Sequence, residues 1–266
     1  MSVRAVIFDI SGTVLDFGSR APVLAFVEVF RRYGVEITEA EARRPMGAGK
    51  RDHIAAVLAD TAVRKRWIEA HGQAHTTTDI EALYRDFTPI QIELLPAHCD
   101  VLPGVPELVA ALRERGLKIA NTTGFARRML KDLIPLAAAG GYQPDFWVCP
   151  DDVGEGRPAP WMAFHAARQM AVYPMHTIVK VGDTPIDIAE AHAAGMWAVS
   201  VVRHGNEIGL SRETLAALSH DERQLRLAMA RERLSAHRPH FILDQTADLL
   251  PVLEEIGERL AAGERP

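Results

Sequence analysis

Hydrophobic residues in this chain are concentrated in short continuous runs that are separated by longer amphipathic segments. A continuous apolar run, unlike an alternating one, is typical of a parallel strand buried on both faces of its sheet. The runs therefore predict six strands, at residues 5–8, 118–120, 146–148, 178–181, 198–202 and 241–243.

Helical patterns lie between these strands. Apolar residues recur with helical spacing over residues 106–115, 127–139, 159–170 and 187–194, and a glycine follows all of these segments but the third. A further charged helical stretch, residues 211–236, precedes the last strand. Because strand and helix alternate, the pattern predicts the α/β class: a doubly wound parallel sheet with a Rossmann-like core.

Residues 19–98 interrupt this alternation. They contain no convincing strand, and helical spacing is found over residues 22–33, 39–44, 50–69 and 79–94. A helical insert directly after the first strand predicts a cap domain, hinged at residues 18–20 and 97–99. The expected organisation is an α/β core made of residues 1–18 and 99–266, and a helical cap made of residues 19–98.

Composition narrows the class of protein. The 266 residues are 48% hydrophobic and 24% charged, and the formal net charge is −5, which argues against a nucleic-acid or anionic-membrane partner. Only two cysteines are present, and neither a secretory-signal pattern nor a membrane-length apolar run is found. We therefore expect a cytoplasmic enzyme that acts on a small molecule.

Polar residues follow three of the predicted strands. Asp9 ends the first strand, Thr123 follows the second, and Asp183 follows the fourth. In an open α/β sheet, ligands bind beyond the carboxyl ends of the strands, so these residues can meet there. Asp9 and Asp183 are predicted to hold a Mg²⁺ ion, and Asp187, one helical turn after Asp183, to orient a metal-bound water.

Three further residues are suited to bind a phosphoryl group. Thr123 and the backbone N–H of Gly124 can donate hydrogen bonds to its oxygens, and Arg157, between Gly156 and Pro158, can supply positive charge. Each of these features alone is equally well explained as a helix cap, a turn or a surface arginine. Their order along the chain is much more specific than any single residue.

The ordered set resembles the haloacid dehalogenase superfamily, whose members transfer phosphoryl groups to an aspartate. The resemblance implies that Asp9 is the nucleophile and a metal ligand, and that the Ser11 backbone carbonyl is another ligand. It also implies that Arg157 replaces the usual lysine, and that the cap selects the substrate. Phosphatases of this superfamily carry a second aspartate where this chain has Ser11, and serine cannot protonate a leaving group at neutral pH.

Lys50 offers another way to activate a leaving group. It begins a predicted helix and shares a partly apolar face with His53, Ile54 and Val57. Burial and the positive helix end disfavour its charged form, so we expect a lowered amine pKa and Schiff-base chemistry with an aldehyde. Met46 is predicted to be a wall of the substrate pocket. For His53, a proton relay and simple packing within the cap are equally good interpretations.

An aspartate nucleophile, a cap lysine and no second acid together resemble the phosphonatase family, which hydrolyses the carbon–phosphorus bond of phosphonoacetaldehyde. The chain differs from that family's usual pattern at Ile10, Ser11 and Phe125. The resemblance implies a Mg²⁺-dependent homodimer. The matching segments are residues 9–13, 16–18, 21–22, 41–43, 45–47, 50–53, 122–124, 156–158, 181–184 and 195–197.

Other functions remain open at this stage. A phosphomonoesterase or a phosphomutase can use the same fold, although Ser11 counts against both. A metal-independent dehalogenase also uses an aspartate nucleophile, and Asp183 and Asp187 argue against it. A catalytically silent ligand-binding module is a third alternative, disfavoured because nucleophile, metal ligands and Lys50 are all retained.

Overall fold

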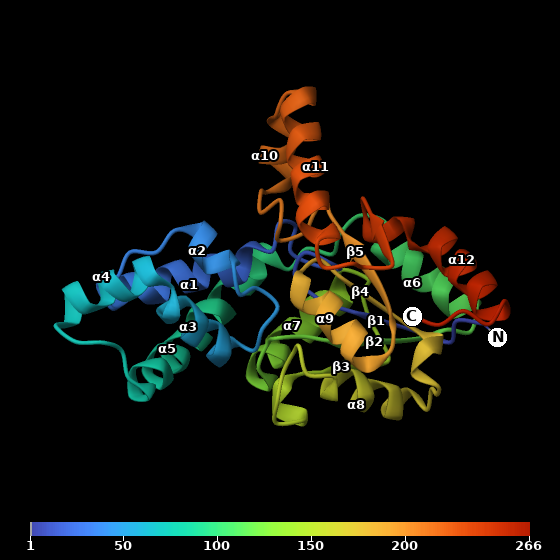
Figure 1. The fold of residues 1–266 in the computed structure, drawn as a ribbon, viewed down its shortest axis with the longest axis horizontal. Coiled ribbons are helices and arrows are strands. Elements are labelled where there is room, and N and C mark those ends of the chain that lie inside the picture. The colour runs from blue at the N-terminus through green and yellow to red at the C-terminus, as the bar shows by residue number, and fades with distance from the viewer. Residues whose placement is uncertain (1) are drawn as a thin grey trace.

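The computed structural model describes residues 2–266 and consists of an α/β core with a helical cap beside it (Figure 1). Within these residues, six parallel strands form one sheet in the order β3-β2-β1-β4-β5-β6. The strands are β1 (Ala5–Phe8), β2 (Lys118–Thr122), β3 (Phe146–Val148), β4 (Ile178–Gly182), β5 (Trp197–Val201) and β6 (Phe241–Leu243). The sheet confirms the predicted fold class, and each predicted strand is present to within two residues.

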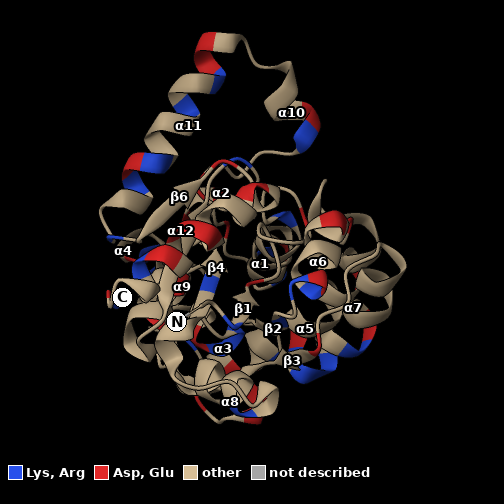
Figure 2. Ribbon diagram, turned by 90° about the vertical axis from the view of Figure 1, so that its right-hand side faces the viewer, with Lys and Arg blue, Asp and Glu red and all other residues tan. Residues whose placement is uncertain are grey.

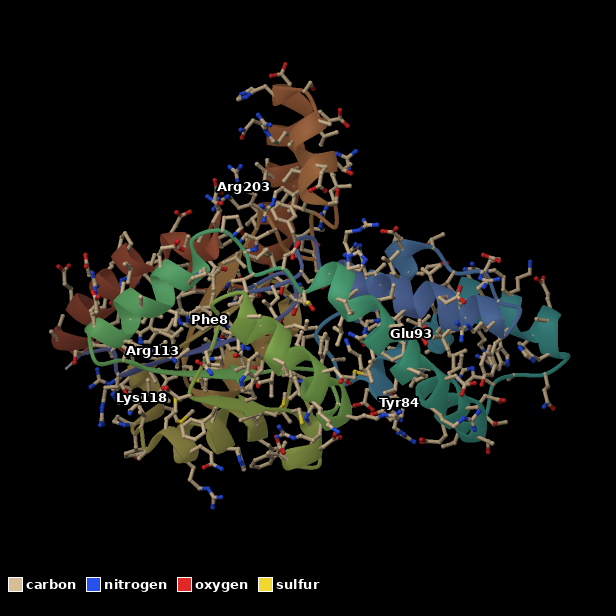
Figure 3. All side chains as sticks on the ribbon, turned by 180° about the vertical axis from the view of Figure 1, so that it is seen from behind. Phe8, Tyr84, Glu93, Arg113, Lys118 and Arg203 are labelled. Carbon is tan, nitrogen blue, oxygen red and sulfur yellow. The ribbon has the colours of Figure 1, made fainter. Side chains whose placement is uncertain are left out.

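Helices cover both faces of the sheet. Alternate residues of β1 point to opposite sides: Val6 and Phe8 pack with α6, α7 and α12, whereas Ala5 and Ile7 pack with α8, α9 and α11. Figure 3 shows Phe8 in the interior of the core. These helices are α6 (Val105–Glu114), α7 (Arg127–Ala139), α8 (Trp161–Met170), α9 (Pro185–Ala194), α11 (His220–Ser235) and α12 (Leu249–Ala261). Short 3₁₀ helices are η1 (Pro150–Asp152), η2 (Met175–Thr177) and η3 (Thr246–Asp248).

The cap is built from five consecutive helices between β1 and α6. They are α1 (Arg20–Arg32), α2 (Glu39–Arg43), α3 (Lys50–Ala59), α4 (Thr61–His71) and α5 (Thr77–His98). The apolar face of α1 is buried within the cap, where Phe26 stacks on Phe87 of α5 with ring centroids 4.3 Å apart. The buried apolar cluster continues from the cap into the core without interruption.

Several expected helix boundaries are wrong. The segment expected as one helix over residues 50–69 is two helices, because the Asp60 side chain accepts hydrogen bonds from the backbone of Ala62 and Val63 and starts α4. The last cap helix extends to His98, so part of the expected second hinge is helical. The charged stretch is also two helices, α10 (Arg212–Ala217) and α11, and α12 was not predicted.

The helices α10 and α11 project from the core as a hairpin (Figure 1), and α11 carries both acidic and basic residues along its length (Figure 2). Leu227, Ala230 and Leu234 are its only buried residues, so the second half of the helix packs on the core and residues 220–226 lie outside it. Within the described residues no helix is long and apolar enough to cross a membrane.

Candidate active site

The site forms where three neighbouring strands end. β1 lies between β2 and β4, and Asp9, Thr123 and Asp183 are the residues that directly follow these strands. All three side chains are buried. The parallel sheet therefore brings together residues that are far apart in the chain, as their positions at strand ends predicted.

Three carboxylates meet at this edge. Asp9, Asp183 and Asp187 each place one oxygen within 4.8 Å of the other two. Asp183 accepts hydrogen bonds from the Thr13 hydroxyl (3.0 Å) and the Asn206 backbone N–H (2.7 Å), but no lysine or arginine of residues 2–266 pairs with it. Burial, together with the neighbouring negative charges, raises the pKa of Asp183 well above its usual range. A buried set of carboxylate oxygens, in which Asp183 has no cationic partner among the described residues, fits a hard divalent cation.

Arg157 holds the other two carboxylates. Its guanidinium donates to Asp9 Oδ1 (2.6 Å) and to the Thr122 carbonyl (2.8 Å), pairs with Asp187, and lies 3.5 Å from Glu190. Burial raises the pKa of Asp9 in spite of this ion pair. Burial opposes ionisation of Asp187 as well, but there the positive charges prevail and lower the pKa. Asp187 is thus a firmly ionised carboxylate beside the site.

A second cation beneath the site escaped the sequence analysis. Lys180, in the middle of β4, donates to Thr122 Oγ1 (2.8 Å) and pairs with Asp187 (3.1 Å) and Glu190 (3.2 Å). Glu190 also accepts a hydrogen bond from the Thr122 hydroxyl at 2.9 Å. The sequence does contain a signal for this pair: Lys180 lies inside an apolar strand, and Glu190 follows Asp187 by one helical turn. Because a buried charge needs a partner, a lysine in such a strand indicates a buried carboxylate nearby.

The cap contributes Lys50, the first residue of α3. Its Nζ lies 5.6 Å from the ring centroid of Phe26 in the cap and 4.9 Å from that of Phe125 in the core. No residue of the described chain forms a hydrogen bond or ion pair with this amine. Burial lowers the pKa of Lys50 to about 7, in the direction expected from the sequence.

Lys50 and Asp9 line the same small cavity, which has a volume of about 20 Å³. This is room for about one water molecule and too little for an organic substrate. Of the residues proposed from the sequence, Arg157, Asp183, Asp187 and His53 do not line it. The residues that line it are Asp9, Ser11, Ser19, Pro22, Met46, Gly47, Lys50, Thr123, Gly124, Phe125 and Thr184.

His53 packs inside the cap. Its ring stacks on Phe26 with centroids 3.8 Å apart, and Nε2–H donates to the Ala42 carbonyl at 2.7 Å. Burial lowers the pKa of His53 well below its usual value, so the ring is neutral. His53 is thus packed within the cap and does not line the cavity, and its role as a proton relay stays a prediction.

Ser19 is a cavity residue that the sequence analysis treated only as part of a hinge. It is buried, its backbone is left-handed (φ 51°, ψ 51°), and its hydroxyl has no hydrogen-bond partner among the described residues. A buried hydroxyl without a partner is rare, and this one borders the cavity that holds Lys50 and Asp9.

A glycine allows the cap to seat on the core. A Cβ atom at Gly124 would lie 3.0 Å from the Ala48 carbonyl carbon and 3.2 Å from the Gly47 oxygen. The cap segment 45–49 therefore covers the cavity in direct contact with the loop that follows β2. Beyond this contact, a cleft of about 800 Å³ between cap and core shares Lys50 and Gly124 with the cavity.

Comparison with known proteins agrees with this architecture. A family model described as haloacid dehalogenase-like hydrolase matches residues 3–195. A phosphonoacetaldehyde hydrolase of Paraburkholderia phytofirmans is 43% identical over 264 residues, covering 99% of each chain. A phosphonoacetaldehyde hydrolase of Bacillus cereus is 41% identical over 256 residues, covering 96% of this chain and 97% of the relative.

Solved structures give the same picture. The crystal structure of a phosphonoacetaldehyde hydrolase-like protein from Oleispira antarctica superposes with a TM-score of 0.98 at 40% identity, covering 100% of this chain and 96% of that one. A putative β-phosphoglucomutase from Bacteroides vulgatus, 17% identical, superposes with a TM-score of 0.65 over 97% of this chain and 91% of its own. At that identity the second likeness concerns the fold alone.

Proposed function

Because the chain belongs to the haloacid dehalogenase-like hydrolases and, within them, to the phosphonoacetaldehyde hydrolase family, we propose that it hydrolyses the carbon–phosphorus bond of phosphonoacetaldehyde to acetaldehyde and phosphate. The observation that carries this proposal is the pairing of two reactive groups. An amine with a pKa of about 7, that of Lys50, borders the same cavity as the carboxylate of Asp9. The amine can attack an aldehyde carbon, and the carboxylate can attack phosphorus.

Lys50 activates the carbon side. The neutral amine adds to the aldehyde carbon, and loss of water, with uptake of one proton, leaves a cationic imine two carbons from phosphorus. Phe26 and Phe125 flank the amine, and the closed cap keeps bulk water away from the imine. The cationic imine can accept the electrons of the carbon–phosphorus bond when that bond breaks. An ordinary phosphate ester has no such group next to its leaving oxygen.

Asp9 accepts the phosphoryl group. Its carboxylate attacks phosphorus, and the electrons of the breaking carbon–phosphorus bond form an enamine as the iminium nitrogen becomes neutral. The enamine then takes a proton on carbon, and water releases acetaldehyde from Lys50. A second water hydrolyses the aspartyl phosphate and frees phosphate. The departing carbon needs no acid beside Asp9, which agrees with the serine at position 11.

The remaining site residues bind and orient the substrate in this proposal. Thr123 and the Gly124 backbone N–H bind phosphoryl oxygens, and Arg157, already hydrogen-bonded to Asp9, adds positive charge beside them. Met46 forms a wall of the cavity.

Asp9, Asp183 and the Ser11 carbonyl are suited to hold Mg²⁺, and Asp187 would orient a water molecule bound to the ion. When bound, the cation offsets the repulsion between the carboxylates and the anionic phosphoryl group.

Trapping of the imine tests the proposal. Incubation with phosphonoacetaldehyde and borohydride should add a reduced two-carbon adduct to Lys50, located by peptide mass mapping. Lys50→Arg keeps a positive charge but cannot form the imine, so turnover should fall at least a thousandfold.

Lys65→Arg, at an exposed lysine paired with Glu69, is the matched control and should keep full activity. An adduct only at other lysines, or near-normal turnover by Lys50→Arg, would overturn the assignment. Efficient hydrolysis of simple phosphate esters would favour a phosphomonoesterase instead.

The same proposal includes a cytoplasmic homodimer. The family resemblance implies a dimer, and the surface of α8 supports it with two aromatic side chains. Trp161 and Phe164 are 49% and 37% exposed, and their rings meet edge to face with centroids 6.0 Å apart. Aromatic residues are enriched where protein surfaces meet.

A further inference from the structure

The loop after β5 is packed directly on the carboxylate of Asp183. The backbone N–H of Asn206 donates to Asp183 Oδ2 at 2.7 Å. A side-chain carbon at Gly205 would lie 2.8 Å from Asp183 Cβ, so the loop has no free space there. The orientation of this carboxylate therefore depends on residues 205–206 together with the Thr13 hydroxyl, which donates to its other oxygen.

The cap reaches the same loop through one arginine. Arg43, the last residue of α2, donates from Nη1 to Asn206 Oδ1 (3.2 Å) and to the Gly18 carbonyl (2.9 Å), and from Nη2 to the Gly209 carbonyl (2.9 Å). Asn206 Nδ2 in turn donates to the Arg43 carbonyl at 3.4 Å. A single guanidinium thus joins the cap, the linker that leads into it, and the core loop on Asp183.

We propose that Arg43 couples cap closure to the metal site, acting through Asn206 on the orientation of Asp183. This inference rests on the proposed function in one respect, namely that Asp183 is a metal ligand. When the cap lifts, Arg43 leaves Asn206 and Gly209, and the loop loses the hydrogen bonds that the cap makes to it, keeping only those from the core. The closed cap therefore presents a better-ordered ligand set than the open one.

Linkage makes the coupling reciprocal. If closure strengthens metal binding, metal binding must favour closure by the same factor, and such factors usually lie between about 5 and 150. Arg43 is then a positioning residue that contacts neither substrate nor metal. Its effect should be visible in metal affinity without any turnover.

Mn²⁺ alone is the probe for the first measurement, because its electron paramagnetic resonance signal reports the free ion. We expect Arg43→Met and Asn206→Ala each to weaken Mn²⁺ binding about tenfold. Both changes remove a side-chain link and leave the Asn206 backbone N–H in place. The double variant should be no weaker than either single one, because both interrupt the same connection.

Arg44→Met is the matched control, since the neighbouring Arg44 is exposed and pairs with Asp60 inside the cap. Its Mn²⁺ affinity should equal that of the wild type. Arg43→Lys keeps the charge but cannot reach three carbonyl groups at once, so it should also bind Mn²⁺ more weakly. This variant keeps the test decisive if Arg43→Met does not fold.

The reciprocal measurement follows the cap. Mn²⁺ should slow modification of Lys50 by an amine reagent in the wild type and should have no such effect in Arg43→Lys. Unchanged Mn²⁺ affinity in the Arg43 variants, or additive losses in the double variant, would overturn the coupling while leaving the imine chemistry intact. Failure of imine trapping with the coupling present would instead overturn only the proposed function.

Discussion

Lys50 shows how position alone changes the chemistry of a side chain. The amine lies between two phenylalanine rings, one from each domain, with no ion-pair partner among the described residues. Burial disfavours the charged amine and outweighs the attraction of the nearby Asp9 carboxylate, so the pKa falls to about 7. Near neutral pH, a large fraction of this lysine is therefore a neutral nucleophile.

The rate of imine formation should follow that titration. We expect the initial rate of borohydride-trapped adduct to rise with pH and to level off above about pH 8. At pH 6 it should be roughly a tenth of the plateau, because a base one unit below its pKa is about one-tenth neutral.

The measurement is the amount of modified Lys50 peptide against pH, with free lysine as the reference amine. A rate that stays low until pH 9 and then rises near pH 10 would contradict the lowered pKa.

Residues that carry chemistry at strand ends could be predicted, but three residues that support them, Lys180, Glu190 and Asn206, were not. Asp9 and Asp183 are recognisable because each follows an apolar run. Lys180 is unusual within an apolar strand, but neither its position nor that of Glu190 shows which residues it pairs with. Asn206 contacts Asp183 through its backbone, which no side-chain pattern reveals.

At the scale of elements, apolar runs located every strand because a doubly covered sheet requires them. Helix ends were less predictable. Asp60 stops one helix and caps the next inside a stretch whose apolar spacing continues, and Pro89 and Pro96 are accommodated within α5. Packing of α5 along α1 outweighs the local preference of proline for helix ends.

The contact between the cap segment 45–49 and the loop after β2 leads to a prediction about Gly124. In Gly124→Ala, the added methyl group would meet the Ala48 carbonyl, so the cap should seat poorly on the core. Turnover should fall on the order of a hundredfold, since a displacement of about 1 Å at a reacting centre has that effect.

Steady-state kinetics with phosphonoacetaldehyde provides the measurement. Gly257→Ala in α12 is the control, because a Cβ atom there meets nothing within 4 Å. Wild-type turnover by Gly124→Ala would show that this contact does not set the position of the cap.

At the scale of the whole molecule, the proposed reaction takes its groups from both the core and the cap. The core supplies the carboxylates and Arg157, and the cap supplies Lys50, so neither domain holds a complete site. Their shared apolar cluster and the contacts of Arg43 keep the closed arrangement together. In Figure 3 the cap can be found by the labelled residues Tyr84 and Glu93, which lie on α5.

The proposed dimer gives a prediction for α8. Trp161→Glu would place a carboxylate within the aromatic surface, and burying that charge is costly, so the dimer should dissociate at micromolar concentration. Light scattering after size-exclusion chromatography measures the mass.

Leu225→Glu, at a 61% exposed position on α11, is the control and should remain dimeric. A wild-type mass of one chain, about 29.3 kDa, would refute the dimer itself.

The place of β1 in the sheet has a consequence for how the chain is made. Phe8 ends the central strand, but its first neighbour begins only at Lys118 and its second at Ile178. A nascent chain therefore exposes this strand while the entire helical insert emerges from the ribosome. The insert can assemble from local contacts, which form quickly, whereas the carboxylate of Asp9 is positioned only after two distant segments arrive.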